Sequence, residues 1–220
     1  MRQCTGMILL TIASVALSQE KRGLAVGDNV PGSFHPFNVT FRVDPSPEPM
    51  VPSARESRST KHKYHCLITE YDMDPVVMLV ARNLDESAGF RDLLTKLNTL
   101  VDNNQRGRLR AFVVALYPEE LTDVVTQDEK RNEYAARLDK LAADLKLTGV
   151  VLTLAAPKDL ARFNFDETVA LNAIVYQKLK VTASRSIGRD ALDQANGPDA
   201  QAVLASVTEL MDKLYPKPKK

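Results

Sequence analysis

The 220-residue sequence predicts an α/β protein with a central mixed sheet and helices on both faces. Three apolar runs, 75–82, 109–117 and 150–155, are separated by segments of helical periodicity, a pattern typical of parallel strands that are buried on both faces. Two more apolar runs, 169–176 and 179–186, follow one another directly and indicate a hairpin. Right-handed crossovers would make the first strands largely parallel, and the hairpin would add antiparallel strands.

The helices between these strands are predicted from their caps and apolar stripes. Asp85 is expected to cap a helix whose apolar side chains recur on one face. Thr126, with Glu129 three residues later, has the pattern of a capping box that opens a second helix. Pro198 stands near the first position of the last helix. The segment Tyr64–Tyr71 is interpreted as an additional strand at the start of this regular region.

The N-terminus has the pattern of a signal peptide, residues 1–18. Arg2 provides a positive charge, Met7–Leu17 is apolar, and small residues precede a cleavage site that would leave Gln19 first. The apolar run is shorter than the ~20 residues that a spanning helix needs. The alternatives are an uncleaved anchor or a different start, but cleavage is favoured. We therefore expect an exported protein, periplasmic or secreted, with no membrane contact beyond the signal peptide.

Composition shifts divide the rest of the chain. Residues 19–43 are expected to form an irregular lead-in with a short strand near 37–41. Residues 44–63 contain four prolines and few apolar side chains, which predicts an extended or disordered insert. A basic arm that docks a partner is the alternative interpretation of this insert. Residues 64–214 hold the regular domain, and 215–220 are a solvated basic tail.

The charge balance excludes one class of partner. The chain has 29 basic and 28 acidic residues, and removal of residues 1–18 would take away one arginine and no acid. A neutral protein lacks the basic surface that nucleic-acid binding requires. Tryptophan is absent and aromatic residues make up 6% of the chain, which also disfavours a base-stacking surface.

The element order and two local motifs resemble the thioredoxin-like superfamily. Pro75–Ala81 is similar to the buried strand that leads into the active-site turn of these proteins. Ala25–Pro31 is similar to the opening of redoxins of the alkyl-hydroperoxide-reductase/thiol-specific-antioxidant type. The resemblance covers most of residues 24–214 apart from the Pro-rich insert, and it implies a thioredoxin-like fold.

This sequence departs from the family at the positions that carry its chemistry. The family's Cys-x-x-Cys should follow Ala81, but residues 82–87 contain no cysteine. Val169 stands where the resemblance places the family's cis-proline, and a cis bond before a residue other than proline costs several kcal/mol. Dithiol exchange needs an attacking and a resolving thiol. The resemblance therefore predicts the fold without thioredoxin-type oxidoreductase activity.

Cys66 is the one cysteine that remains after Cys4 leaves with the signal peptide. Strand alternation would place it with Tyr64 and Ile68 on a core face, with His65 on the other face. A cysteine in such a group is a small core residue. Cations at 61–63 could instead lower the pKa of the thiol and make Cys66 a reactive group or a partner in a mixed disulfide.

Metal and cofactor sites are not predicted. The histidines are at 35, 62 and 65. His62 and His65 could form at most a loose cluster with Cys66, whereas a structural zinc site needs about four ligands. The sequence also has no glycine-rich phosphate loop and no Gly-x-Ser-x-Gly motif.

Arg82, Asn83 and Asp85 are the binding candidates. They follow a central strand at the edge of the sheet where open α/β proteins place their ligands. An anion or a peptide could bind there; a salt bridge from Arg82 to Asp85 or Glu86 is the structural alternative. We expect a non-catalytic binding module for a protein, peptide or small ligand. A single-thiol redox protein that acts through Cys66, hence a thiol-dependent oxidoreductase, is the alternative, and a binding role for the arm 44–63 is a third hypothesis.

Overall fold

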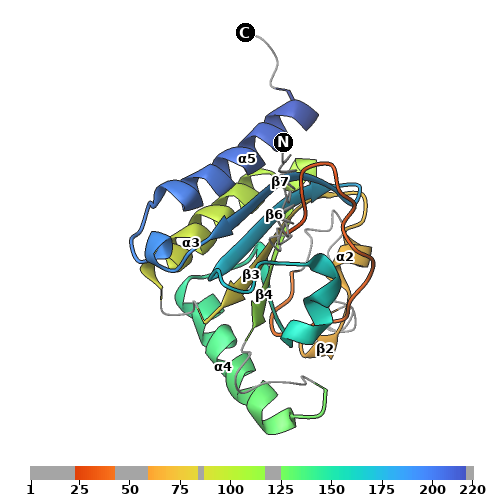
Figure 1. The fold of residues 1–220 in the computed structure, drawn as a ribbon, viewed down its shortest axis with the longest axis vertical. Helices are drawn as coiled ribbons and strands as arrows, with labels where there is room; N and C mark the ends of the chain where they lie inside the picture. The colour runs from red at the N-terminus through yellow and green to blue at the C-terminus, as the bar shows by residue number, and fades with distance from the viewer. Residues whose placement is uncertain (1–22, 43–58, 84–86, 117–124, 217–220) are drawn as a thin grey trace, which may run out of the picture.

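A computed structural model describes residues 23–42, 59–83, 87–116 and 125–216. They form a mixed seven-stranded sheet in the order β2-β1-β5-β4-β3-β6-β7, flanked by helices (Figure 1). The predicted α/β class and mixed sheet are confirmed. The predicted signal peptide, most of the Pro-rich insert and most of the tail lie outside the described residues. Within the described ranges, no helix is both long and apolar enough to cross a bilayer.

The three central strands match the continuous apolar runs of the sequence. β3 (Pro75–Arg82), β4 (Arg110–Leu116) and β5 (Val150–Ala155) pair in parallel. Their residues are buried on both faces, except for the partly exposed Arg82. Strands with no solvent-facing side can be apolar at every position, and for that reason they show no alternation in the sequence.

The predicted hairpin is also present. β6 (Leu171–Gln177) pairs antiparallel with β3 and with β7 (Lys180–Ile187). Lys178 and Leu179 connect the two strands with positive φ angles of 51° and 59°. Two consecutive residues with positive φ give the turn a twist that matches that of the strands, although neither residue is a glycine or an asparagine.

The opposite edge of the sheet is built from the lead-in. β1 (Phe37–Asn38) pairs antiparallel with β5, and β2 (Lys63–Tyr64) pairs with β1. Residues 59–63, which the sequence placed in the Pro-rich insert, form a turn and enter β2. The lead-in therefore belongs to the same sheet as the regular domain.

The prediction of a strand over Tyr64–Tyr71 is wrong. Only Lys63–Tyr64 forms a strand, and Leu67–Glu70 is the short helix α2. Cys66 is the N-cap of this helix, and its Sγ accepts a hydrogen bond from the Thr69 amide (3.4 Å). A short run with several apolar residues fits either a strand or a turn of helix, so periodicity could not distinguish them.

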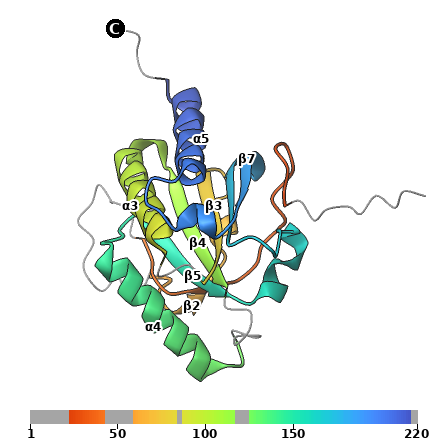
Figure 2. The same cartoon turned by 60° about the vertical axis from the view of Figure 1, so that its left-hand side comes forward.

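Three long helices cover one face of the sheet. They are α3 (Ala88–Asn103), α4 (Asp128–Asp144) and α5 (Pro198–Leu214) (Figure 2). β3, β4 and β5 step in one direction through right-handed crossovers, so α3 and α4 lie on the same face. The other face is covered by α2, by the 3-10 segment η2 (Pro157–Phe163) and by the lead-in.

Two predicted helix caps differ in the structure. Ser87 caps α3, with its Oγ accepting from the Phe90 amide (3.2 Å), whereas Asp85 lies outside the described residues. α4 begins at Asp128 after Gln127, so the capping box of Thr126 and Glu129 is wrong. A cap requires non-helical backbone at one particular residue, and the chain enters each of these helices slightly later than the side-chain pattern suggested.

Candidate functional site

The candidate site lies where the parallel strands end. β3, β4 and β5 point their carboxyl ends to one edge of the sheet, and the segments before β6 and after β7 reach the same edge. This is the edge at which open α/β sheets hold ligands. The structure brings Arg82 and Asn83 together there with three residues that the sequence analysis did not select: Asp166, Glu167 and Arg189.

The backbone after β3 is held from two sides. The Arg82 amide donates to the Ala170 carbonyl (2.9 Å) in the segment before β6. Arg189, which follows β7, donates from Nη2 to the Arg82 carbonyl (3.0 Å) and from Nη1 to the Asn83 carbonyl (3.1 Å). Asn83 has a φ of 49°, a left-handed conformation that asparagine adopts more readily than most residues. The backbone of the turn is therefore held by the Ala170 carbonyl and the Arg189 side chain, and the Arg82 side chain is not needed to hold it.

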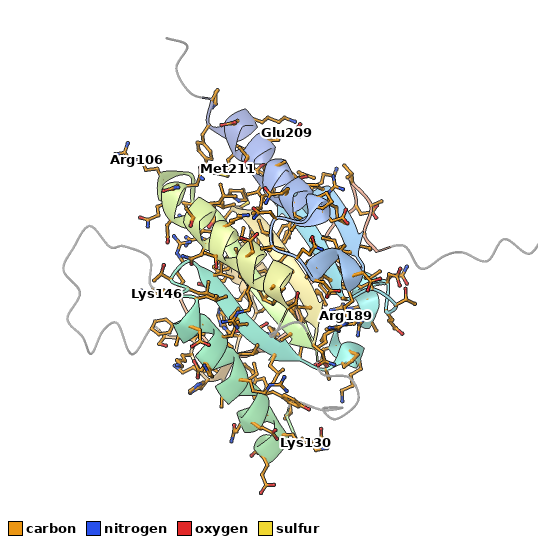
Figure 3. All side chains as sticks on the ribbon, turned by 90° about the vertical axis from the view of Figure 1, so that its left-hand side faces the viewer. Arg106, Lys130, Lys146, Arg189, Glu209 and Met211 are labelled. Atoms are coloured by element: carbon orange, nitrogen blue, oxygen red, sulfur yellow. The ribbon has the colours of Figure 1, made fainter. Side chains whose placement is uncertain are left out.

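Arg189 and its surroundings are visible in Figure 3. Arg189 lies beside the 3-10 segment η3 (Asp190–Leu192), at the amino end of α3, whereas Arg106 lies at the opposite end of the α3–α5 layer. Ser87 joins α3 to η3 because its Oγ donates to the Leu192 carbonyl (2.6 Å). The amino end of α3 is thus anchored beside Arg82.

The guanidinium of Arg82 is half-buried and lacks hydrogen bonds to the described residues. Its Nε is buried and has no partner among them. Burial lowers the pKa of Arg82, while the negative charges of Glu167 and Asp166 act in the opposite direction. An arginine remains protonated despite such a shift. The site therefore presents a charged fork whose Nε–H donor is unused.

The acidic side of the site is a tight turn before β6. Asp166 accepts hydrogen bonds from the Thr168 amide (2.8 Å) and hydroxyl (2.6 Å), and these bonds lower the pKa of Asp166. The buried Asn172 amide donates to the Asp166 carbonyl (3.1 Å) and accepts from the Ser186 hydroxyl (3.0 Å). Asp166 thus uses one of its oxygens within its own turn and is near enough to Arg82 to affect its pKa, but it is not hydrogen-bonded to it.

Val169 lies in this turn, directly before Ala170. All peptide bonds of the described residues are trans. Ala170 links three strands, because its carbonyl accepts from Arg82 and its amide donates to the Ile187 carbonyl (3.1 Å). The Val169 side chain is half-buried at the same edge as Arg82.

The sequence suggested a salt bridge from Arg82 to Asp85 or Glu86. Asp85 and Glu86 lie outside the described residues. The acids that affect Arg82 among the described residues come from a segment far along the chain, at 166 and 167. No sequence motif indicates that Asp166 and Glu167 lie near Arg82. They do so because the start of β6 lies beside the end of β3.

Cys66 is remote from this edge. Its side chain is 5% exposed, and its Sγ accepts from the Thr69 hydroxyl (3.1 Å). It packs in the apolar layer with Ile68, as predicted, but Tyr64 is exposed because the chain turns into α2 instead of continuing as a strand.

The histidines do not gather around a metal position. His62 is 3.3 Å from Asp139, and His65 is 2.7 Å from Glu70. In the part of the chain that the structure describes, no three histidine, cysteine or acidic side chains are grouped as metal ligands. No metal site is proposed.

Comparison with known proteins places the fold. No protein-family model and no curated protein matches the sequence. Among solved structures, an uncharacterized conserved protein from Geobacillus kaustophilus has a TM-score of 0.55 at 12% identity, over 89% of this chain and 86% of its own. A Chlorobium tepidum protein described as a putative thiol:disulfide interchange protein DsbE has a TM-score of 0.52 at 12% identity, over 84% and 97%. A mutant of Xanthomonas campestris peroxiredoxin Q has a TM-score of 0.44 at 12% identity, over 68% and 87%.

The fold is therefore thioredoxin-like, as the sequence motifs predicted. Similarity at this level of identity establishes the fold and leaves the chemistry to the residues of this chain. In this chain the central strand β3 ends at Arg82 and is followed by Asn83.

Proposed function

We propose that this protein is an exported thioredoxin-fold binding module that holds a peptide or protein ligand at the carboxyl edge of its sheet. The observation that carries the proposal is the Arg82 guanidinium, half-buried at that edge with an unpartnered Nε. Export is inferred from the signal-peptide pattern of residues 1–18. A non-catalytic role is supported by the absence of cysteine at 82–87 and by the position of Cys66 beside Tyr176, which lies toward the opposite ends of β3 and β6 from Arg82.

The chemistry of Arg82 indicates the acceptor that it binds. A guanidinium presents five N–H donors in a planar fork that matches a carboxylate, and it also donates to peptide carbonyls. A ligand oxygen would accept from the terminal N–H groups of the fork, because the Nε itself is buried. Asp166 and Glu167 partly balance the arginine charge in the free protein and would repel a ligand that carries several negative charges. We therefore expect a peptide with one carboxylate or an exposed carbonyl at the contact.

Peptide selection followed by substitution of Arg82 tests this proposal. Peptides selected from a displayed library would be labelled and titrated by fluorescence anisotropy, each as a free acid and as a C-terminal amide. Arg82→Met should weaken binding by about tenfold or more, because charge-assisted hydrogen bonds are lost. Arg106→Met removes an exposed arginine from the far end of α3 and should change nothing. Equal binding by wild type and Arg82→Met would refute the proposed site.

The second candidate is a single-thiol redox protein that uses Cys66. One observation favours it: the Thr69 hydroxyl donates a hydrogen bond to Sγ (3.1 Å) and so holds the sulfur in one orientation. Burial opposes it, because a sulfur in a side chain that is 5% exposed is poorly accessible to a second molecule. The rate of native thiol labelling distinguishes the two candidates.

A further inference from the structure

A separate pocket lies at the other edge of the sheet, between β1, the turn before β2 and α4. Its volume is about 450 Å³, which is within the size range of small-ligand sites. Two strands, β5 and β4, lie between β1 and β3, the strand that ends at Arg82. The pocket therefore does not depend on the proposed role of Arg82.

The lining of the pocket is apolar on one side and carries flat groups on the other. Phe37 and Ala135 are buried lining residues, and Ala136 is an exposed one. The imidazole of His62 lies parallel to the Phe37 ring, with 5° between the planes and 6.0 Å between the centroids. The Arg131 guanidinium carbon lies 4.8 Å from the centroid of the same ring.

The charged groups of the pocket already have partners of opposite charge. Asp139 contacts the Lys61 ammonium (2.9 Å) and the His62 Nε2 (3.3 Å). Arg131 contacts Asp128 (2.6 Å). An ionic ligand would have to compete with these pairs and would lose part of its hydration without a free counter-charge. An uncharged ligand meets no such cost.

The flat groups favour a planar ligand. Imidazole and guanidinium faces both stack on aromatic rings, and aromatic pairs add attraction beyond the area that they bury. The His62 side chain is 55% exposed, so part of its ring is accessible from the pocket side or from solvent. His62 is held in this position with a φ of 58°, by its amide hydrogen bond to the Asn38 carbonyl (2.6 Å) and by its contact with Asp139.

We propose that this pocket binds one uncharged planar aromatic group. The group is either a free small aromatic molecule or the aromatic side chain of a partner peptide, and both sources present the same ring to Phe37, His62 and Arg131. The ring lies against the apolar floor that Ala135 and Ala136 complete. The ion pairs at the rim stay in place.

The absence of tryptophan from this chain allows a direct assay. N-acetyltryptophanamide is titrated with the full protein, and the emission and anisotropy of its indole report binding without tryptophan background from the protein. A capped tripeptide with a central tryptophan forms the second arm. We expect saturable binding, and N-acetylleucinamide should not compete. Binding of both probes indicates a free aromatic ligand, whereas binding of the tripeptide alone indicates a partner segment.

Two substitutions in the pocket and one control outside it locate the binding. Ala136→Leu fills the pocket from an exposed helix position and should abolish binding, whereas Ala143→Leu, at an exposed position of α4 outside the pocket, should not. His62→Asn removes the ring, keeps a side chain that accepts the positive φ and can still bond Asp139. It should weaken binding by about tenfold.

Three results would overturn the inference. They are no saturable binding of either probe, binding that Ala136→Leu leaves unchanged, and equal weakening by Ala136→Leu and Ala143→Leu. The outcome of the Arg82 experiment does not bear on this one, because β4 and β5 lie between β3, which ends at Arg82, and β1 of the pocket.

Discussion

Replacement of Arg82 by methionine should change the free energy of unfolding by between about −0.5 and +1.5 kcal/mol. A fully buried polar group without a hydrogen bond costs roughly 1–3 kcal/mol, and Arg82 is only half-buried, so at most about half of that is relieved. Loss of its attraction to Asp166 and Glu167 opposes this gain by up to about 1 kcal/mol, since exposed ion pairs contribute little. Methionine keeps most of the apolar packing of the stem.

A buried arginine of the same fold provides the contrast. Arg110 is 5% exposed, and its Nε lies 3.0 Å from an oxygen of Asp74, while its guanidinium lies 5.3 Å from the Tyr71 ring. Removal of one partner from a buried pair costs roughly 3–5 kcal/mol, but Arg108 also contacts Asp74 (3.0 Å). We therefore expect Arg110→Met to lose roughly 2–4 kcal/mol.

Urea unfolding followed by circular dichroism measures both variants. The slope against urea concentration should stay equal to that of the wild type, so that midpoint shifts report stability alone. A loss of more than about 1 kcal/mol in Arg82→Met would mean that the side chain supports the fold through its attraction to Asp166 and Glu167, and the argument for a ligand-binding arginine would fail. A gain, together with weaker peptide binding, is the expected signature of a residue kept for function at the expense of stability.

Three further predictions concern other parts of the fold. Gly89→Ala should lower stability by roughly 1–3 kcal/mol, because a Cβ would lie 2.5 Å from the Leu192 carbonyl oxygen. Gly32→Ala should leave stability unchanged, because no atom lies within 4 Å of the added Cβ. Thermal melting measures both variants. Cys66 should react with a maleimide in the native protein far more slowly than in urea, and equal rates would contradict its burial. The hydrogen bond from Lys96 lowers the pKa of Asp92 in the folded protein. The ionised Asp92 therefore stabilises the fold above the unfolded-state pKa of about 4, and this stabilisation is lost as the pH falls through the lower pKa of the folded state. Urea midpoints between neutral and acidic pH should therefore fall less steeply in Asp92→Asn.

The two proposed sites differ in how the fold builds them. The Arg82 site lies at the edge where three parallel strands end, and its polar groups arrive from segments far apart in the chain. The aromatic pocket lies where the short β1 and the turn before β2 meet α4. A module with two separate contacts could bind an extended peptide along one surface only if both contacts faced the same side, and competition between the two kinds of probe would show whether they do.

The sequence by itself determined the elements whose side chains follow one regular pattern of burial. β3, β5 and α5 were predicted with bounds close to those observed, because a strand that is buried on both faces is apolar throughout and an amphipathic helix repeats its apolar positions. The motifs on Pro75–Ala81 and Ala25–Pro31 also identified the thioredoxin-like fold. The absence of cysteine after Ala81 was likewise visible in the sequence alone.

Tertiary structure decided what depends on contacts between distant residues. The N-cap of α2 is formed by Cys66, whose Sγ accepts hydrogen bonds from the Thr69 amide and hydroxyl, and no periodic pattern reveals such contacts. Arg82 acquires its acidic neighbours only because β6 pairs with β3, and Arg189 reaches its carbonyl only because β7 pairs with β6. The aromatic pocket exists because the turn that carries His62 is bonded to β1 and packs against α4. Local pattern specifies burial and periodicity, whereas a site is defined by which separate segments the sheet brings to the same edge.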